Sequence, residues 1–218
     1  MATPLLALVV DVKTGVALSI LPNIVMDAIQ AGRRGLRVST ARRVGVLLGF
    51  GFVGTVLGTR SLMVLPASVA LGLLGLFVLA FVALNASGLR VQVPARWESW
   101  LSPPVGLAAG FLGGITNVPG TLLVIYFHAL GMDKYEFVRS VALCFLTYKL
   151  IQLGAVSYYG LLTWPLLGAS AALTAGGLGA FWLGLRVQDA LPERTFNRAV
   201  LVFLAILGLS LVARSVWT

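Results

Sequence analysis

The sequence predicts an all-α integral membrane protein, a polytopic helix bundle with two inverted-topology repeats and one broken-helix hairpin. Composition is the first observation behind this fold class. Of the 218 residues, 59% are hydrophobic and only 11% are charged, whereas an ordinary soluble domain carries about 25% charged residues. The mean hydropathy of +0.98 agrees. A chain with so few polar side chains cannot cover a water-exposed surface, so we expect it to lie in a lipid bilayer.

Apolar runs recur along the chain, and we expect each to form a transmembrane helix. They cover residues 16–31, 44–59, 64–86, 138–158, 163–185 and 199–213. The longest polar interval between them is roughly 87–103. The sequence therefore predicts no separate soluble domain.

Short segments recur in the same order in both halves, which indicates an internal repeat. VALSIL at 16–21 resembles VALCFL at 141–146, which lies 125 residues later. Three further residues recur 126 positions later, namely Gly58, Arg60 and Pro66. We therefore predict a first repeat, a cytoplasmic linker and a second repeat, at residues 1–90, 91–103 and 104–218.

Basic residues predict which way each half crosses the membrane. Lys and Arg concentrate in cytoplasmic loops, so the interval 32–43, with its five arginines, is expected on the cytoplasmic side. A single crossing by residues 104–131 would place five later basic residues outside: Lys134, Arg139, Arg186, Arg194 and Arg198. A hairpin at 104–131 places all five inside. We therefore predict a hairpin, which gives the repeats the inverted topology of many secondary transporters.

The hairpin contains a break in an apolar passage, GGITNVPG at 113–120. We expect half-helices at 104–115 and 118–130, with Thr116 or Asn117 as the N-cap of the second. Such a break must be buried in protein or line a wet cavity, and a half-helix N-terminus favours an anion. The alternative is a proline kink in a packed helix. The candidate substrate-binding residues here are Gly114, Thr116, Asn117 and Gly120.

The first half-helix also carries a stripe of small residues on one face, Gly106, Gly110 and Gly114. Small residues let another helix backbone approach closely in a membrane. We interpret the stripe mainly as a packing surface.

Polar side chains within the apolar runs are further candidates, because they are costly in a bilayer. Asp27 follows Asn23 by four residues and shares its helix face. Lys149 lies near the middle of its run, where it could hold an anion or pair with Asp27. Snorkelling toward the interface is the alternative for both charges. We assign coupling or proton transfer to Asp27, and substrate binding to Lys149, Tyr148, Gln152 and Asn23.

The second half resembles a known family. The resemblance rests on the glycine-rich turn before Pro119, on Phe137 and Arg139 in a Phe-x-Arg pattern, and on the Tyr159-Gly160-Leu161 turn. A glycine-rich helix ending at Gly184 and Arg186 and the Pro-Glu-Arg-x-Phe run at 192–196 add to it. These features are similar to those of the TauE/SafE sulfite exporter family.

This resemblance covers residues 106–214 closely and 4–86 more loosely. It implies a secondary transporter that exports sulfite, a sulfonate or a related sulfur-containing or carboxylate anion by alternating access. Family members carry a comparable glycine-rich element at the start of the first half as well. The first repeat of this chain begins at about the proline that should follow that element.

Other function classes are less favoured by the residues present. One histidine, the single Cys144 and no paired intramembrane acids predict no metal site, no cofactor and no enzyme. An anion channel or facilitator would use the same residues as a transporter. A membrane enzyme acting on lipid phosphates would need clustered acid, base or nucleophile groups at the break. A purely structural subunit would not need a polar break.

We expect two partners, the lipid bilayer and a small anionic substrate. The net charge of +9 reflects orientation in the membrane rather than nucleic-acid binding. A homodimer is left open by the sequence. The expected location is the bacterial cytoplasmic (inner) membrane, crossed several times.

Overall fold

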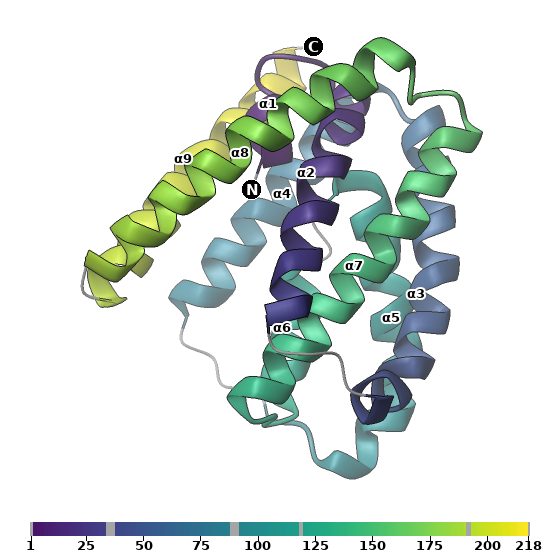
Figure 1. Ribbon diagram of the computed structural model, residues 1–218, viewed down its shortest axis with the longest axis vertical. Helices are drawn as coiled ribbons and strands as arrows, with labels where there is room; N and C mark the ends of the chain where they lie inside the picture. The colour runs from purple at the N-terminus through teal and green to yellow at the C-terminus, as the bar shows by residue number, and fades with distance from the viewer. Residues whose placement is uncertain (1, 34–37, 88–91, 118–119, 191–192, 218) are drawn as a thin grey trace. The chain divides into compact units, whose positions relative to one another are not determined.

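A computed structural model describes residues 2–33, 38–87, 92–117, 120–190 and 193–217. The helices of these residues are α1 (Ala2–Leu6), α2 (Val12–Arg33), α3 (Val38–Val64), α4 (Ala67–Ala86), η1 (Ala95–Trp97), α5 (Glu98–Thr116), α6 (Gly120–Ala129), α7 (Lys134–Tyr158), α8 (Trp164–Ala190) and α9 (Glu193–Trp217) (Figure 1). No strand occurs in the described part of the chain. The predicted all-α fold class is therefore confirmed.

Four helices of the described residues are long and apolar enough to cross a membrane, at Val12–Ile29, Val38–Val64, Ala67–Leu84 and Tyr135–Tyr158. They coincide with four of the predicted apolar runs. The two remaining runs lie in α8 and α9 and stay predicted spans. Helix α3 also exposes large apolar side chains at helical spacing, Val46, Phe50, Val53 and Leu57. Such a stripe suits lipid contact, and the chain is a multi-pass membrane protein.

The chain forms two compact units, and each unit takes segments from both halves of the sequence. Unit 1 comprises Met1–Pro22, Leu65–Leu89 and Thr163–Thr218, and unit 2 comprises Asn23–Val64 and Arg90–Leu162. Contacts define these units, whereas sequence similarity defines a repeat. The predicted division at 1–90, 91–103 and 104–218 therefore stays a prediction. Every candidate site residue belongs to unit 2.

In unit 2, α3 and α5 lie side by side with their backbones in contact (Figure 1). Glycines line both sides of this contact, Gly51, Gly54 and Gly58 on α3 and Gly106, Gly110 and Gly114 on α5. A Cβ added at Gly114 would lie 2.6 Å from Thr55 O and 2.7 Å from Thr59 N. No side chain fits in that space. The small-residue stripe predicted on the first half-helix is thus a packing surface.

The core of unit 2 lies among α3, α5, α6 and α7. Its buried members are Val44, Leu47, Ala109, Leu123, Tyr126, Phe127, Cys144 and Tyr148. Tyr148 of α7 donates a hydrogen bond from Oη to Leu47 O at 3.2 Å. A Cβ added at Gly51 would overlap its ring. Tyr148 therefore joins α7 to α3.

The passage at 104–131 folds back on itself, as predicted. Val93 N donates to Ala129 O at 2.8 Å, so the segment before α5 meets the end of α6. Gly131 then follows α6 with φ of 62°, a left-handed conformation that glycine adopts at little cost. The broken-helix hairpin is confirmed.

The start of α5 differs from the prediction. We expected the first half-helix at 104–115 because proline favours the first turn of a helix. Instead α5 begins at Glu98 and continues through Pro103 and Pro104. Ser102 Oγ donates to Glu98 O at 2.7 Å, and Tyr126 Oη of α6 donates to the same oxygen at 2.9 Å. The bond within α5 from Ser102 and the tertiary bond from Tyr126 support an earlier start than the sequence pattern indicates, so part of the predicted linker 91–103 is helical.

Unit 1 is held by a second glycine-mediated helix pair, α4 with α9. A Cβ added at Gly75 of α4 would lie 2.8 Å from Val212 Cγ2 of α9. Near the end of α9, Arg214 donates to Leu8 O, which follows α1. This bond ties the N-terminal segment to the last helix.

The start of α2 is fixed by Asp11. Its Oδ1 accepts from Thr14 N at 3.0 Å and its Oδ2 from Thr14 Oγ1 at 2.5 Å. Burial raises the pKa of the Asp11 carboxyl, but the hydrogen bonds from Thr14 outweigh it and hold that pKa below its usual value. Asp11 therefore caps α2 as an anion.

The register that relates Gly58 to Gly184 in the sequence belongs to the predicted repeat. Both the internal repeat and the inverted topology of its halves stay predictions.

Candidate functional site

Asn117 ends α5 at the break. Its φ of 61° places it in the left-handed region, which asparagine tolerates better than most residues. Its backbone N–H donates to Gly113 O at 2.8 Å. The predicted N-cap role is therefore wrong, because Thr116 is the last residue of α5 and Asn117 is its C-cap. Residues 118–119, including Pro119, lie outside the described residues.

Two side chains of α7 complete the end of α5. Lys149 Nζ donates to Asn117 O at 2.8 Å, to Asn117 Oδ1, and to Gln152 Oε1 at 3.2 Å. Gln152 Nε2 donates to Gly113 O at 3.2 Å and to Gly114 O at 3.1 Å. The last carbonyls of a helix have no intrahelical partner. Lys149 and Gln152 satisfy several of them from outside.

This cluster is almost fully buried. The exposed fraction is 3% for Lys149, 4% for Asn117, 1% for Gln152 and 1% for Thr116. A buried ammonium group is costly unless it is hydrogen-bonded, and here oxygen atoms of Asn117 and Gln152 surround it. The C-terminus of α5 also carries about half a negative charge. We call Lys149, Gln152, Asn117, Thr116 and Gly114 the break cluster.

The sequence-predicted residues fall into four groups. The first is the break cluster, which the structure brings together. The second is Tyr148, whose hydroxyl is bonded to α3. The third is Asn23 with Asp27, both half-buried on α2, and the fourth is Gly120, the first residue of α6.

Asp27 is half-buried on α2, whereas Lys149 is buried on α7. No ion pair joins the two side chains in the described part of the chain, where Lys149 instead contacts oxygen atoms of Asn117 and Gln152. The predicted alternative in which Lys149 pairs directly with Asp27 is not the arrangement seen.

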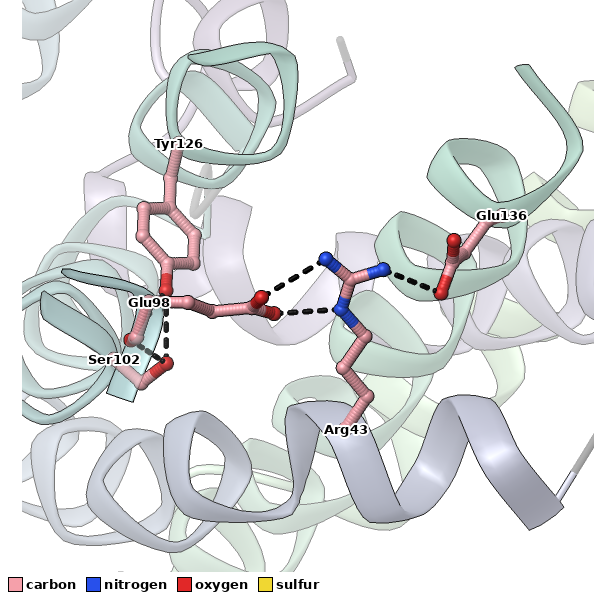
Figure 2. Close-up of polar contacts among 5 residues, drawn as sticks. All are labelled: Arg43, Glu98, Ser102, Tyr126 and Glu136. Carbon is pink, nitrogen blue, oxygen red and sulfur yellow. Dashed lines mark hydrogen bonds and ion pairs between the residues drawn. The ribbon is translucent and has the colours of Figure 1, made fainter. Parts of the chain in front are cut away.

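A second polar cluster, which the sequence did not predict, joins the N-terminal parts of α3, α5 and α7 (Figure 2). Arg43 of α3 donates from Nε to Glu98 Oε1 at 2.7 Å and from Nη2 to Glu98 Oε2 at 2.9 Å. Its Nη1 donates to Glu136 Oε1 at 2.7 Å. Ser102 and Tyr126 are hydrogen-bonded to each other beside Glu98 at 2.8 Å. Arg43 therefore links α3, α5 and α7.

This cluster decides between the two topologies considered for 104–131. Glu98 precedes the passage and Glu136 follows it, and both contact Arg43. A single crossing would have put these two carboxylates on opposite sides of the membrane. Their shared partner requires that the chain return to the side from which it came.

Arg43→Ala is expected to lower the thermal midpoint of the purified protein more than Arg42→Ala. Without Arg43, the carboxylates of Glu98 and Glu136 face each other with no cation between them. We expect a loss of about 1–2 kcal/mol, reduced by the partial exposure of the groups. Arg42 is exposed and adjacent, and serves as the control.

Thermal unfolding in detergent at low and high salt measures this effect. High salt should reduce the difference in thermal midpoint between wild type and Arg43→Ala, because screening weakens the ion pairs. Equal midpoints for the two alanine variants would show that the Arg43 cluster does not hold the three helices.

Comparison with known families agrees with the resemblance noted in the sequence. The family described as Sulfite exporter TauE/SafE matches residues 1–211. No curated protein and no solved structure matches the chain. The family match spans nearly the whole chain and includes the break cluster. The chain therefore belongs to the sulfite exporter TauE/SafE family, a family of membrane transporters.

Proposed function

We propose that the protein exports a small anion across the bacterial cytoplasmic membrane, with sulfite, a sulfonate or a related sulfur-containing or carboxylate anion as substrate. The observation that carries this proposal is the buried ammonium group of Lys149 at the break between α5 and α6. Family membership supports the substrate class.

The charges at the break favour an anion. Helix α5 ends at Thr116 and α6 begins at Gly120, so the negative end of one helix dipole and the positive end of another lie close in the chain. These partial charges of about one half each oppose one another. The full positive charge of Lys149 therefore makes the net charge at the break positive. Free N–H groups in the first turn of α6 would supply hydrogen bonds to the anion.

The membrane potential can drive this export. Moving one negative charge out of a cell whose interior is negative gains about 2.3 kcal/mol per 100 mV. Alternating access would come from one repeat rocking against the other around the break, as in transporters built from inverted repeats.

Asp27 is the proposed coupling residue, because it is a half-buried carboxyl group within an apolar helix. While Asp27 is ionised it offsets the positive charge at the break, and protonation removes that offset. Asp27→Asn is therefore expected to bind the anion more tightly at neutral pH and to make transport insensitive to a pH gradient. Flux in proteoliposomes with and without a pH gradient measures this. An unchanged pH response in Asp27→Asn would exclude the coupling role.

A thermal-shift screen in detergent tests the function itself. Sulfite, sulfate, alkyl sulfonates and small carboxylates are compared at equal concentration and ionic strength, with chloride as the reference. A ligand that binds only the folded protein stabilises it by RT ln(1 + L/Kd), where L is the free ligand concentration, so the midpoint rises with ligand concentration. We expect sulfite or a sulfonate to raise the midpoint of the wild type in this concentration-dependent way. If none of these anions stabilised the protein, the proposed substrate class would be wrong.

A further inference from the structure

Thr59 of α3 carries a side-chain hydroxyl that is buried and unpaired within the fold. Its exposed fraction is 0%, and its Oγ1 has no hydrogen-bond partner. A buried hydroxyl left unpaired lowers the stability of the fold. Buried polar groups in native proteins are nearly always paired, so an unpaired one calls for an explanation.

The place of Thr59 in the fold connects it to the break. A Cβ added at Gly114 would lie 2.7 Å from Thr59 N, so the backbone of Thr59 lies against Gly114 of α5. The carbonyl of Gly114 accepts from Gln152 Nε2 at 3.1 Å, and Gln152 Oε1 accepts from Lys149. Thr59 therefore contacts Gly114, and Gly114 accepts one of the hydrogen bonds that hold the break cluster.

Thr55 shows how a threonine is usually accommodated on this helix face. One turn before Thr59, its Oγ1 donates to Gly51 O at 2.8 Å. This bond to the carbonyl four residues earlier is the common solution for a helical threonine. The hydroxyl of Thr59 does not make the equivalent bond. Its donor is therefore not used within the chain.

We propose that Thr59 is a substrate-contacting residue, whose hydroxyl donates a hydrogen bond to an oxygen atom of the anion bound at the break. This inference rests on the proposed function, because it assumes that an anion binds beside Lys149. Lys149 would supply charge, whereas Thr59 would supply a neutral hydrogen bond from α3. Oxyanions such as sulfite and sulfonates offer several acceptor oxygens for such a donor.

Thr59→Val tests the proposal because it removes the hydroxyl and keeps the shape of the side chain. Affinity for sulfite is measured by titration in detergent, and the midpoint of the unliganded protein is measured alongside. We expect affinity to fall about fivefold, the effect of one neutral hydrogen bond. The unliganded midpoint should be unchanged or higher, because no protein hydrogen bond is lost. Thr59→Ser should restore the affinity.

Two control variants separate this role from a structural one. Thr55→Val removes a hydroxyl that is bonded within the protein, so it should lower the unliganded midpoint and leave sulfite affinity unchanged. Among the residues that the structure describes, Ser140 of α7 is the other buried hydroxyl without a partner. It lies nine residues before Lys149, roughly 14 Å along the helix. Ser140→Ala should leave affinity unchanged.

The outcomes distinguish the two proposals. Unchanged sulfite affinity in Thr59→Val, with normal binding by the wild type, would overturn the role of Thr59 alone. A lower unliganded midpoint with unchanged affinity would assign the hydroxyl to packing or to a buried water. If the wild type bound neither sulfite nor a sulfonate, the proposed function and the role of Thr59 would both fall.

Discussion

Lys149→Met is expected to abolish measurable anion binding and to lower the stability of the protein. The methionine removes the buried positive charge at the break, and with it the attraction of that charge for the anion. A loss of at least about 1.4 kcal/mol makes binding at least tenfold weaker. It also leaves acceptors of Asn117 and Gln152 unpaired, which costs about 1–3 kcal/mol.

Lys149→Gln separates the two roles of this residue. Glutamine can still donate a hydrogen bond to the end of α5 but carries no charge. We expect it to recover part of the thermal midpoint lost in Lys149→Met and none of the anion binding. Leu150 is the adjacent, exposed residue, and Leu150→Met serves as the matched control. Anion binding retained in Lys149→Gln would show that the charge is not required.

Asn117→Ala is expected to have the second largest effect. Alanine at a φ of 61° lowers the free energy of unfolding by about 1–2 kcal/mol, because Cβ approaches the following carbonyl in the left-handed region. The substitution also removes the Oδ1 acceptor of Lys149. The ammonium group would then lose its position at the break, and anion affinity should fall about tenfold.

Asn117→Gly isolates the side-chain part of this effect. Glycine accepts the left-handed backbone without strain, so the thermal midpoint should fall less than in Asn117→Ala. Anion affinity should fall equally in both variants, because both lack the amide. If glycine restored full affinity, Asn117 would matter only for the backbone of the break. Midpoints and anion titrations on the same preparations measure both quantities.

The transmembrane helices were the easiest part of the fold to predict. Long apolar runs require helices in a bilayer, because every backbone polar group must be satisfied internally. Charge counting found the hairpin, and the contacts of Arg43 with Glu98 and Glu136 agree with it. Helix α5 begins six residues earlier than predicted. The Tyr126 hydroxyl of α6 donates to Glu98 O and supports this earlier start. No local sequence pattern reveals such a contact.

The break cluster was predicted in part. A cation near the middle of an apolar run pointed to Lys149, and the glycine-proline break pointed to Asn117. The sequence assigned Asn117 to the wrong helix end, because asparagine is favoured both as an N-cap and in the left-handed conformation after a helix. It did not indicate that Lys149 and Gln152 satisfy the end of α5, since this requires the packing of α7 against α5.

Two features gave too weak a signal to find in advance. Arg43 is one of five arginines in the interval 32–43, where a preference for the cytoplasmic side explains basic residues without any partner. Thr59 is a threonine in an apolar helix, where bonding to the preceding turn is the usual expectation. Only the absence of that bond in the structure distinguishes it from Thr55.

Flux of radiolabelled sulfite in proteoliposomes tests the central claim, that the buried ammonium group of Lys149 binds the exported anion. Wild type, Lys149→Gln and Leu150→Met are reconstituted at equal density, and a membrane potential is imposed in either direction. We predict saturable flux that follows the potential in wild type and Leu150→Met, and flux at the level of empty vesicles in Lys149→Gln. Wild-type flux in Lys149→Gln would contradict the account.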